Sequence, residues 1–531
     1  MMMSLDLVAV VVFFVFVSRR IVSYLHIFQQ DEYDNARFIR WLFVSGSFDR
    51  KLSLGLLLIG AAALWRPLGH LSPAVSVGLA AAAFAVAAAL EPDPRKVAKK
   101  KLVMTARAKR IFGLALVLMI AIGTAFIVIL PPFAWVVPIH LVPFVLALAN
   151  LILLPFEHFV QMRYWMEAHA KIASYHPTII GITGSYGKTS VKHILGHILQ
   201  MVASTLITPG SVNTAMGISR IVRENLGVHH RYFLVEMGAY GRGSIARLCT
   251  LAPPAFGVIT AIGKAHYERY KSLDAVAETK FELAHAVQRN GGKVVTWADA
   301  LSFPAGRAFA AGCPQSLITC GTDECSLTLR SVRATTDGVF ADVVWAGKSY
   351  ILKAPLYGLH NGENIAIAFA AACTLGVAPE QVQMALLSTP QITHRLEVKH
   401  NAAGAVVIDD AYNSNPRGFA TALEVLGVFG KPGGRRILVT PGMVELGAAH
   451  EPEHQRIGSL AAKYVDLLLA VAPARITSFI TAYTNAAPHG KVVFCATFAV
   501  AEEWLAVNLN FDDVVLLEND LPDLYERKLR M

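Results

Sequence analysis

The chain has 531 residues, of which 54% are hydrophobic and 16% are charged, and its formal net charge is +10. This length exceeds what one hydrophobic core usually serves, so two to four domains are expected. A mean hydropathy of +0.47 is too high for an ordinary soluble protein and indicates membrane segments.

Apolar segments are concentrated before Pro155, and each approaches or reaches the roughly 20 residues that cross a bilayer. They occupy residues 5–17, 52–65, 71–90, 111–130 and 133–154. We predict a transmembrane region of about five helices over residues 1–155, in which the first two segments are the shortest. A cleaved signal peptide is the alternative for the first segment, but it lacks a preceding basic region and a clear small-residue cleavage site.

Basic residues gather in alternate connections between these segments. They are Arg19, Arg20, Arg37, Arg40, Arg50 and Lys51 before the second segment, and Arg95, Lys96, Lys99, Lys100, Lys101, Arg107, Lys109 and Arg110 between the third and fourth. The positive-inside rule places the N-terminus outside and the chain after Pro155 in the cytoplasm. We therefore predict a multi-pass protein of the cell (inner) membrane. Membrane lipids rather than nucleic acid are the expected partner of this charge, because no basic and aromatic interleaving of the RNA-binding kind accompanies it.

A glycine-rich turn follows a predicted linker at residues 156–175. An apolar strand at 179–183 runs into Gly-Ser-Tyr-Gly-Lys-Thr-Ser at 184–190. Such a turn presents backbone N–H groups to phosphate oxygens, and its lysine adds a positive charge. The motif predicts binding of a nucleoside triphosphate such as ATP. An ordinary strand-turn-helix corner is the alternative, because Ile182 stands where the strict Walker pattern has glycine.

The residues of this turn have separate predicted roles. Glycines at 184 and 187 let the backbone curve around phosphates. Thr189 can place its hydroxyl on Mg²⁺ where a helix over residues 190–202 begins. The predicted nucleotide-binding residues of the turn are Gly184, Ser185, Gly187, Lys188, Thr189 and Ser190.

Polar residues also follow neighbouring strands of the predicted sheet. Strands at 232–237 and 255–261 alternate with helices, which indicates a parallel sheet with catalytic groups at the carboxyl ends of its strands. Glu236, His266 and Lys280 occupy that region. Taken singly, each has an ordinary interpretation, as a solvated carboxylate, a surface or core histidine and a solvent-facing helical lysine.

Together these motifs resemble those of the Mur ligases, the ATP-dependent amide-forming enzymes that build the peptide stem of bacterial cell-wall precursors. Matching features run over residues 179–446, roughly half the chain. Val-Glu-Met-Gly-Ala at 235–239 resembles the family's Mg²⁺-binding segment. Ala-His-Tyr-Glu-Arg-Tyr at 265–270, followed by Ala-Glu-Thr-Lys at 277–280, repeats the family's His and Lys at their usual spacing.

The resemblance implies roles for these side chains. Thr189 and Glu236 would hold one Mg²⁺, and His266 and Lys280 would help to hold a second. In relatives this lysine is often carbamylated, and the carbamate contacts the metal. The implied catalytic residues are therefore Lys188, His266 and Lys280.

Further motifs match downstream. The His-Asn-x-x-Asn element implies that Asn361 contacts adenine, and the turn that opens the C-terminal domain implies that Arg395 reaches ATP. The Asp-Asp-x-Tyr-Asn segment implies that Asp409 and Asn413 serve nucleotide binding and domain closure.

The implied fold is a helical transmembrane region, a phosphate-loop α/β central domain with a parallel sheet at 176–393, and a Rossmann-like α/β domain at 394–531. Tyr-Asn-x-Asn-Pro and the Met-x-Glu-Leu-Gly segment at 443–447 match the branch that adds D-alanyl-D-alanine to a muramoyl tripeptide. The C-terminal domain would close over the ATP site and exclude water.

The chain departs from this branch in three places. Membrane segments replace a soluble UDP-binding domain, Pro441-Gly442 replaces Gly-Asp, and residues 517–525 stand where relatives have Lys-Gly-Ser. The expected substrates are a muramoyl-peptide precursor, UDP-linked or lipid-linked, and D-Ala-D-Ala or another amino acid or dipeptide. A membrane polyglutamate-type or other amino-acid ligase is one alternative. A membrane scaffold ATPase without ligase activity is another.

Overall fold

The computed structural model describes residues 2–31, 33–44, 73–91, 93–97, 101–130, 135–263, 270, 272–401, 404–411, 414–444 and 446–519. The chain divides into two compact units, Met1–Val160 and Gln161–Asp520. The predicted span at 52–65 and two predicted site residues, His266 and Asn413, lie outside the described residues.

Apolar helices make up the described part of the first unit. The helices are α1 (Met2–Gln30), α2 (Asn35–Val44), α4 (Pro73–Leu90), α5 (Pro94–Val97), α6 (Ala106–Ile129) and α7 (Val136–Tyr175). Three segments, Asp6–Gln30, Ala106–Ile129 and Val136–Tyr175, are long and apolar enough to cross a membrane, and Val77–Leu90 is a shorter apolar segment. The prediction of apolar helices ahead of the α/β domains is confirmed, and their orientation stays a prediction.

The helix α1 is longer than the predicted segment at 5–17, because the basic residues after that segment do not end it. Arg20 is 3% exposed, and its Nη1 lies 2.9 Å from Glu91 Oε2. This pairing offsets the cost of a charge inside an apolar bundle. Phe13 packs against Phe84 with 5.4 Å between ring centroids. The Arg20–Glu91 and Phe13–Phe84 contacts both join residues 71 positions apart in the sequence, so α1 and α4 run parallel.

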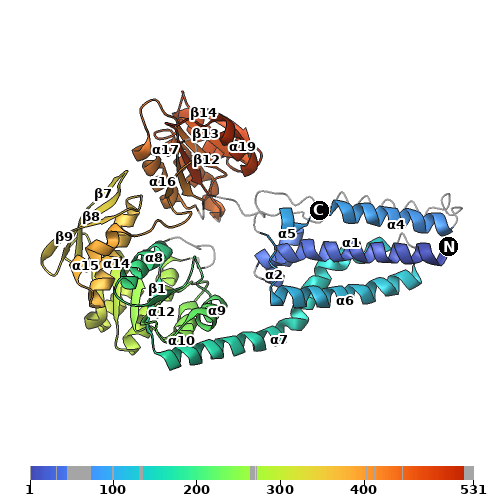
Figure 1. Cartoon of the computed structure of the whole chain (residues 1–531), viewed down its shortest axis with the longest axis horizontal. Helices are drawn as coiled ribbons and strands as arrows, with labels where there is room; N and C mark the ends of the chain where they lie inside the picture. Colours follow the sequence, from blue (N-terminus) through green and yellow to red (C-terminus); the bar gives the residue numbers. More distant parts are fainter. Residues whose placement is uncertain are drawn as a thin grey trace. The chain divides into compact units, whose positions relative to one another are not determined.

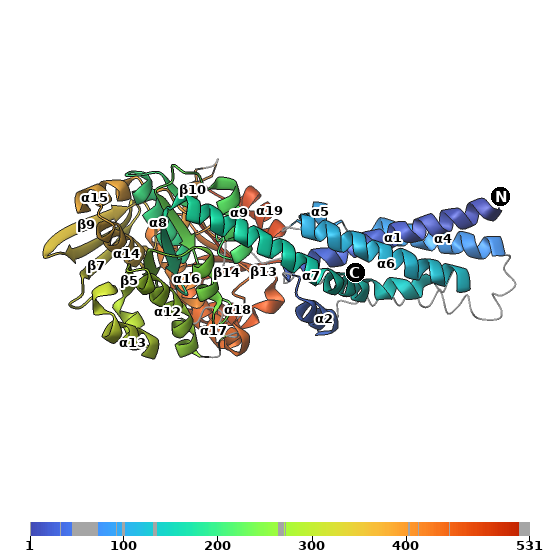
Figure 2. The ribbon, with the colours of Figure 1, turned by 90° about the horizontal axis from the view of Figure 1, so that it is seen from below.

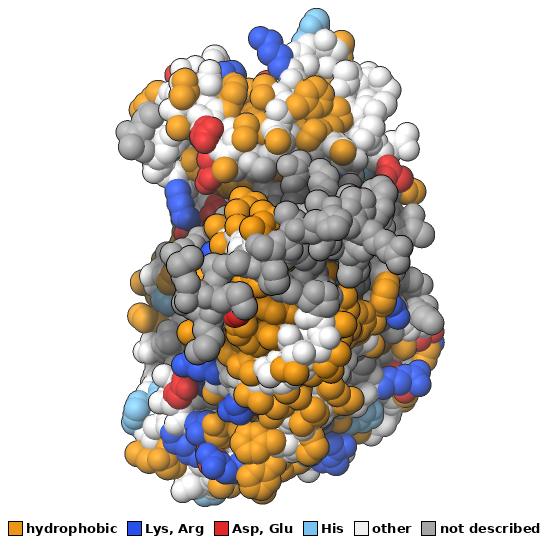
Figure 3. Space-filling model, turned by 90° about the vertical axis from the view of Figure 1, so that its right-hand side faces the viewer, with side chains coloured by type: hydrophobic (Ala, Val, Ile, Leu, Met, Phe, Trp, Pro, Cys, Tyr) orange, Lys and Arg blue, Asp and Glu red, His pale blue; other side chains and the backbone are white. Residues whose placement is uncertain are grey.

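The helix α6 runs antiparallel to α1, and Figures 1 and 2 show these helices side by side. Gln29 near the end of α1 bonds to the N–H and carbonyl of Val103 before α6 (3.0 and 2.7 Å), whereas Gly123 farther along α6 packs against Phe13. Hydrophobic side chains gather on the face shown in Figure 3. Exposed apolar residues of the unit include Val11, Val15, Leu79, Val86, Val117, Ile120, Leu148 and Leu151. Such outward apolar surface suits a lipid environment.

The helix α7 is continuous over 40 residues and includes the predicted linker at 156–175. Beyond Gln161 its side chains belong to the second unit. Ala168 and Ile172 are buried in a core cluster of that unit, and Lys171 Nζ donates to the Arg223 carbonyl at 2.9 Å. The last turns of this helix therefore help to cover the first sheet of the second unit.

The first sheet of the second unit has nine strands in the order β2-β3-β1-β4-β5-β6-β7-β8-β9. The strands are β1 (Thr178–Thr183), β2 (Thr205–Ile207), β3 (Tyr232–Glu236), β4 (Phe256–Ile259), β5 (Lys293–Trp297), β6 (Leu317–Gly321), β7 (Leu327–Thr335), β8 (Gly338–Trp345) and β9 (Lys348–Ala354). In this order, each strand from β2 through β7 is parallel to its neighbour, whereas β8 is antiparallel to both β7 and β9. The predicted parallel sheet is confirmed, and the antiparallel ribbon extends it.

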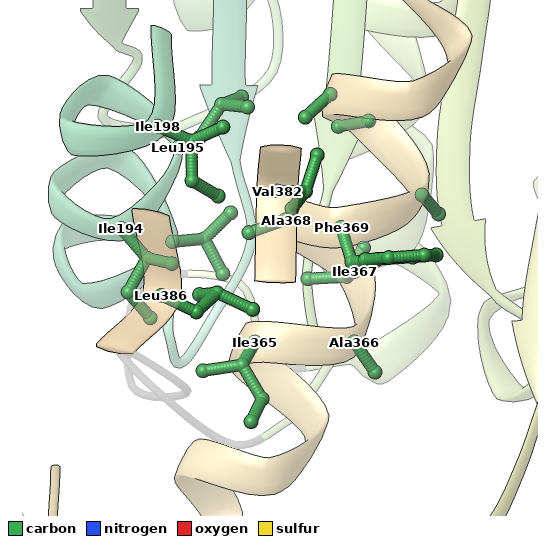
Figure 4. Close-up of a cluster of buried hydrophobic side chains, with 14 of the residues drawn as sticks. Ile194, Leu195, Ile198, Ile365, Ala366, Ile367, Ala368, Phe369, Val382 and Leu386 are labelled. Atoms are coloured by element: carbon green, nitrogen blue, oxygen red, sulfur yellow. The ribbon is translucent and has the colours of Figure 1, made fainter. Parts of the chain in front are cut away.

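Helices cover both faces of this sheet. They are α8 (Lys188–Gln200), α9 (Ala215–Asn225), α10 (Ser244–Leu251), α12 (Leu273–Arg289), α13 (Pro304–Gly312), α14 (His360–Thr374) and α15 (Pro379–Leu387). On one face Ile194 and Leu195 of α8 meet Ile365 of α14 and Leu386 of α15, as Figure 4 shows. On the other face, α9, α10 and α12 contribute to a second apolar cluster. Burial of these side chains holds β1, and the turn after it, in place.

The second sheet has six strands in the order β10-β11-β15-β12-β13-β14, and only β10 is antiparallel to its neighbour. Its elements are β10 (Glu397–His400), β11 (Val406–Asp410), α16 (Pro416–Phe429), β12 (Arg436–Thr440), α17 (His450–Ala461), β13 (Leu467–Val471), α18 (Thr477–Ala486), β14 (Lys491–Cys495), α19 (Phe498–Asn508) and β15 (Val514–Glu518). Side chains of α16, α17 and α18 form one apolar cluster with this sheet, and α19 belongs to another. The expected α/β fold of this part is confirmed.

Candidate active site

The glycine-rich turn lies between β1 and α8, and its backbone requires glycine at two positions. Gly184 has a φ of 149° and Gly187 one of 80°. A Cβ on Gly184 would overlap the Thr260 hydroxyl, and one on Gly187 would lie 2.6 Å from Asn364 Oδ1. No side chain caps the first turn of α8. The amide groups of that turn are therefore available to an anion such as a phosphate.

Lys188 begins α8 and folds back over the turn. Its Nζ donates to the carbonyl oxygens of Gly184 and Ser185, at 2.8 and 3.3 Å. Burial lowers the pKa of Lys188, although Glu236 favours its charged form. The two serines of the motif are buried, and Ser185 Oγ donates to the Gly263 carbonyl at 3.0 Å. Ser185 therefore fixes the shape of the turn, while Lys188 supplies its charge.

Glu236 ends β3 beside this turn and is only 1% exposed. Its Oε2 accepts hydrogen bonds from Thr189 Oγ1 and Lys192 Nζ, both at 2.9 Å, and its Oε1 accepts one from Asn213 Nδ2 at 3.2 Å. Burial acts to raise the pKa of Glu236, but Lys192, Lys188 and the Thr189 hydroxyl together hold it below the ordinary value. The side chain is therefore a buried carboxylate in contact with the threonine of the turn.

Lys192 is a component of the site that the sequence motifs do not assign. It is 2% exposed, and its Nζ also donates to the Gly210 carbonyl. One signal in the sequence could have indicated it: Lys192 lies one helical turn after Lys188, among apolar residues that face the sheet. A lysine on the buried side of a helix needs a counterion, and Glu236 is that counterion.

Lys280 projects from α12 and is 5% exposed. Burial, followed by repulsion from Lys188, lowers the pKa of Lys280 to about 7, while Glu282 and Glu236 act in the opposite direction. Its amine can therefore lose its proton near neutral pH, which an exposed lysine does not do. The segment that carries His266, the predicted neighbour of Lys280, lies outside the described residues.

Of the predicted downstream residues, Asn361 belongs to α14 of the middle domain itself, and Arg395 follows that domain in the chain. Arg395 Nη2 reaches Thr189 Oγ1 at 3.5 Å, at the upper limit of a hydrogen bond, so the C-terminal domain contributes a cation to the turn. Asn361 is 4% exposed and uses its amide inside the protein, donating to the Tyr357 carbonyl at 2.6 Å and accepting from Asn364 at 2.9 Å. The predicted contact of Asn361 with adenine stays a prediction.

Asp409 belongs to a separate cluster at the end of β11. Its Oδ2 lies 2.8 Å from His394 Nδ1 and 3.4 Å from Lys399 Nζ. Oxygen and nitrogen atoms of His394, Glu397 and Asp409 lie within 4.8 Å of one another, a spacing that could hold a metal ion. The ammonium of Lys399 already contacts Glu397 at 2.8 Å and Asp409. We therefore assign no metal to this cluster.

A buried carboxyl pair lies beside it, again unassigned by the sequence motifs. Glu518 at the end of β15 is fully buried, and burial together with Asp410 raises its pKa well above the ordinary value. Burial also raises the pKa of Asp410 to about 6. Ser414 Oγ donates to Glu518 Oε1 at 2.5 Å. Burial and the neighbouring Asp410 therefore favour a protonated Glu518 carboxyl group at neutral pH. Glu518 lies in the segment at 517–525, where the resemblance led us to expect Lys-Gly-Ser.

The site combines a phosphate turn with a buried carboxylate that contacts the threonine of the turn, and a second α/β domain contributes an arginine to it. These features define a phosphate-loop protein of the two-domain ligase type. The Mur ligase middle domain profile matches residues 182–372, and the profile described as Mur ligase, glutamate ligase domain matches residues 394–518. The chain belongs to the Mur ligase family.

Curated relatives support this membership. The chain is 33% identical over 344 residues to UDP-N-acetylmuramoyl-tripeptide--D-alanyl-D-alanine ligase of Mycobacterium tuberculosis H37Rv, covering 60% of this chain and 61% of the relative. It is 32% identical over 376 residues to the protein of that name from Mycobacterium leprae, covering 64% and 70%. It thus spans about three fifths of the length of the M. tuberculosis relative.

Solved structures show the same fold. MurF from Acinetobacter baumannii superposes with a TM-score of 0.57 at 23% identity, covering 69% of this chain and 78% of that one. MurF ligase from Thermotoga maritima, in complex with ADP, superposes with a TM-score of 0.56 at 24% identity, covering 70% and 82%. These likenesses establish the α/β architecture of the second unit.

Proposed function

We propose that this protein is an ATP-dependent amide ligase that joins an amino acid or dipeptide to a muramoyl-peptide cell-wall precursor. One observation carries the proposal: Lys188 and Thr189 of the phosphate turn lie with the buried carboxylate of Glu236, while Lys280, buried nearby, has a pKa of about 7. An ordinary strand-turn-helix corner needs neither the buried carboxylate of Glu236 nor the buried amine of Lys280. The names of the M. tuberculosis and M. leprae relatives and the ADP bound to the T. maritima relative are consistent with the proposal.

The proposed reaction has two steps. A carboxylate oxygen of the muramoyl peptide attacks the γ-phosphorus of ATP, and the bond to the β-phosphate oxygen breaks, giving an acyl phosphate and ADP. The amine nitrogen of the second substrate then attacks the acyl carbon, the C–O bond breaks, phosphate leaves, and the nitrogen gives its proton to solvent. Lys188, the amides of α8 and Arg395 would offset the negative charge that gathers on the phosphates. Closure of the C-terminal domain would keep water from the acyl phosphate.

The side chains at the turn fit a magnesium ion. The Thr189 hydroxyl and the Glu236 carboxylate are adjacent oxygen donors, which Mg²⁺ prefers, and Glu236 is ionised at neutral pH. When bound, Mg²⁺ would neutralise phosphate charge. We propose that Lys280, as a carbamate formed from its neutral amine and carbon dioxide with release of a proton, helps to hold a second Mg²⁺. His266 is the proposed further ligand of that ion.

The lowered pKa of Lys280 makes activity dependent on pH. Carbamate formation needs the neutral amine, so the rate is expected to rise as pH increases through about 7, and added bicarbonate should raise it most there. Stability should rise over the same range, because above pH 7 the unfolded lysine binds a proton that the folded one has lost. Initial rates of amide formation from about pH 6 to about pH 9, with and without bicarbonate, check this. A rate that bicarbonate leaves unchanged at every pH would argue against the carbamate.

The identity of the second substrate rests on the C-terminal domain. The matched relatives named above favour D-Ala-D-Ala. However, Pro441 and Gly442 stand in place of the Gly-Asp of the branch that the chain resembles, and the buried Glu518, next to Asp410, lies in the segment at 517–525 that departs from its Lys-Gly-Ser. We therefore propose D-Ala-D-Ala or another amino acid or dipeptide as the acceptor.

The proposed location is the cell (inner) membrane, with the ligase domains on the cytoplasmic side, where ATP is present. We propose a membrane region to residue 155, a helical linker at 156–175, a central domain at 176–393 and a C-terminal domain at 394–531. Apolar helices in place of a UDP-binding domain favour a lipid-linked muramoyl peptide over a UDP-linked one. Two Mg²⁺ ions, ATP, membrane lipids and the wall precursor are the proposed cofactors and partners, and nucleic acid is not among them.

An acceptor screen tests the proposal. The full chain in detergent would be incubated with ATP, Mg²⁺, UDP-linked or lipid-linked muramoyl tripeptide, and single amino acids or dipeptides, and amide products would be identified by mass spectrometry. We expect one product equal in mass to the condensed pair, formed together with ADP and phosphate. Repeated glutamate addition would instead indicate a polyglutamate ligase. ADP formation without any amide product would indicate the scaffold ATPase. Turnover of only the UDP-linked donor would refute the lipid-linked one.

A further inference from the structure

Among the described residues of the first unit, four arginines are partly or fully withdrawn from solvent: Arg19, Arg20, Arg107 and Arg110. Arg20 and Arg110 are neutralised by carboxylates. Arg20 pairs with Glu91 at 2.9 Å. Arg110 makes two parallel bonds to Glu157, from Nε at 2.6 Å and from Nη2 at 2.9 Å. Arg107, one turn before Arg110 on α6, makes no ion pair with any described residue, and its Nε is buried without a hydrogen-bond partner.

Arg107 is nevertheless held in a defined place. Asn150 of α7 is 1% exposed, and its Oδ1 accepts a hydrogen bond from Arg107 Nη2 at 3.1 Å. The amide nitrogen of Asn150 donates to the Tyr33 carbonyl at 3.1 Å and to Asn35 Oδ1 at 2.9 Å, so the amide is fully used. The guanidinium also lies 4.4 Å from the centroid of the Tyr33 ring. A buried amide and an aromatic ring therefore orient a cation that makes no ion pair with any described residue. Glu157, the carboxylate that acts on it from a greater distance, is already paired with Arg110.

The position of Arg107 in the bundle suits an anion from the membrane boundary. It lies in the first turn of α6, at the same end of the bundle as Gln29 near the end of α1. Lys101 and Lys109 beside it are exposed and add positive charge. A guanidinium without a direct ion pair at the edge of an apolar bundle is costly, and a phosphate oxygen would offset that cost. Guanidinium groups bind phosphates with two parallel bonds, which a point charge does not offer.

We propose that Arg107, oriented by Asn150 and Tyr33, binds a phosphate group of a membrane lipid at this end of the helical unit. The shared chemistry is a lipid phosphate, which either the diphosphate of a polyprenyl-linked wall precursor or a phospholipid head group could supply. If the phosphate comes from the polyprenyl-linked wall precursor, this proposal rests on the proposed ligase function. In that case Arg107 would hold the lipid end of the donor substrate while its peptide is extended by the ligase domains.

Lipid binding by the full chain in phosphate-free detergent tests this without ATP or an amine, so a failure of the ligase proposal does not affect the result. Native mass spectrometry would measure the binding of polyprenyl diphosphate and, separately, of phosphatidylglycerol. Arg107→Gln is expected to weaken polyprenyl diphosphate binding about ten-fold, the effect of losing one charge-assisted pair. Lys109→Gln removes the same charge from an exposed neighbour and should change binding by less than about two-fold, because exposed charges contribute little.

The outcomes separate the alternatives. A loss confined to polyprenyl diphosphate supports a wall-precursor site, and an equal loss for phosphatidylglycerol supports a general phospholipid site. Equal effects of Arg107→Gln and Lys109→Gln, or no loss in a variant with an unchanged melting temperature, would overturn the proposal. Arg107→Lys keeps the charge without the planar fork, and serves if the glutamine variant does not fold. A partial loss in this variant supports the proposal, and full binding overturns the two-bond contact.

Discussion

Replacing Lys280 by alanine is expected to lower the rate of amide formation by about 10²- to 10³-fold, the usual cost of removing one preorganised electrostatic group from an active site. The reason is its environment: Lys280 is 5% exposed inside α12, near Lys188 and Glu236, and has a pKa near 7. A solvent-facing helical lysine would have neither the burial nor the lowered pKa. Product formation by the full chain under saturating ATP and substrates measures the effect.

Two comparisons make this result specific. Lys293→Ala changes an exposed lysine at the start of β5 and should leave the rate unchanged. Short carboxylates such as acetate or propionate should restore part of the activity of Lys280→Ala, because they can occupy the place of a carbamate. Full activity of Lys280→Ala would refute the catalytic role of this residue. Loss without rescue, and without any effect of bicarbonate on the unmodified protein, would favour a role as an amine.

Lys192→Met is expected to lower the free energy of unfolding of the second unit by about 3–5 kcal/mol, the usual cost of breaking a buried ion pair by removing one partner. Glu236 would remain buried at 1% exposure without its principal cation, and its pKa would rise. Affinity for Mg²⁺ should fall as well, because a protonated carboxyl group is a poor metal ligand. Thermal or chemical denaturation and the Mg²⁺ dependence of the rate measure the two effects separately.

A second substitution distinguishes the ion pair from simple packing. The double variant Lys192→Met with Glu236→Gln removes both charges, so much of the lost stability should return while activity remains low. Lys293→Met is the matched control for the loss of a lysine at an exposed site. If Lys192→Met is as stable as the unmodified protein, or if the double variant is no more stable than the single one, the buried pair does not have the importance assigned to it here.

Local features of this protein could be predicted because they depend on short-range rules. The turn at 184–190 follows from the conformations open to glycine and from the strand and helix beside it, and the structure confirms β1 and α8 around it. The helix begins at Lys188, two residues before the predicted start, because Gly187 with its left-handed backbone ends the turn there. Apolar helices were predictable from composition and length, since crossing a bilayer leaves little choice of residue.

Other features depend on partners that lie far apart in the chain. Glu236 is 44 positions from Lys192, and Glu91 is 71 positions from Arg20, so no local pattern pairs them. The length of α1 shows the consequence: Arg19 and Arg20 look like the end of a membrane segment, yet the helix continues because Glu91 neutralises Arg20. The antiparallel β7–β9 ribbon likewise depends on pairing between strands, which hydrophobic alternation alone does not specify.

The sequence by itself determined the phosphate turn, the apolar membrane helices, the alternation that makes the first sheet, and the resemblance to the Mur ligases, which implied the second α/β domain. Each follows from residue type and spacing within one or two elements. Only the tertiary structure decided which charges are buried and with which partners: Lys192 with Glu236, Asp410 beside Glu518, and Arg107 without a direct ion pair among the described residues. Burial depends on how distant segments pack, and it sets the strength of a charge and the pKa of a group.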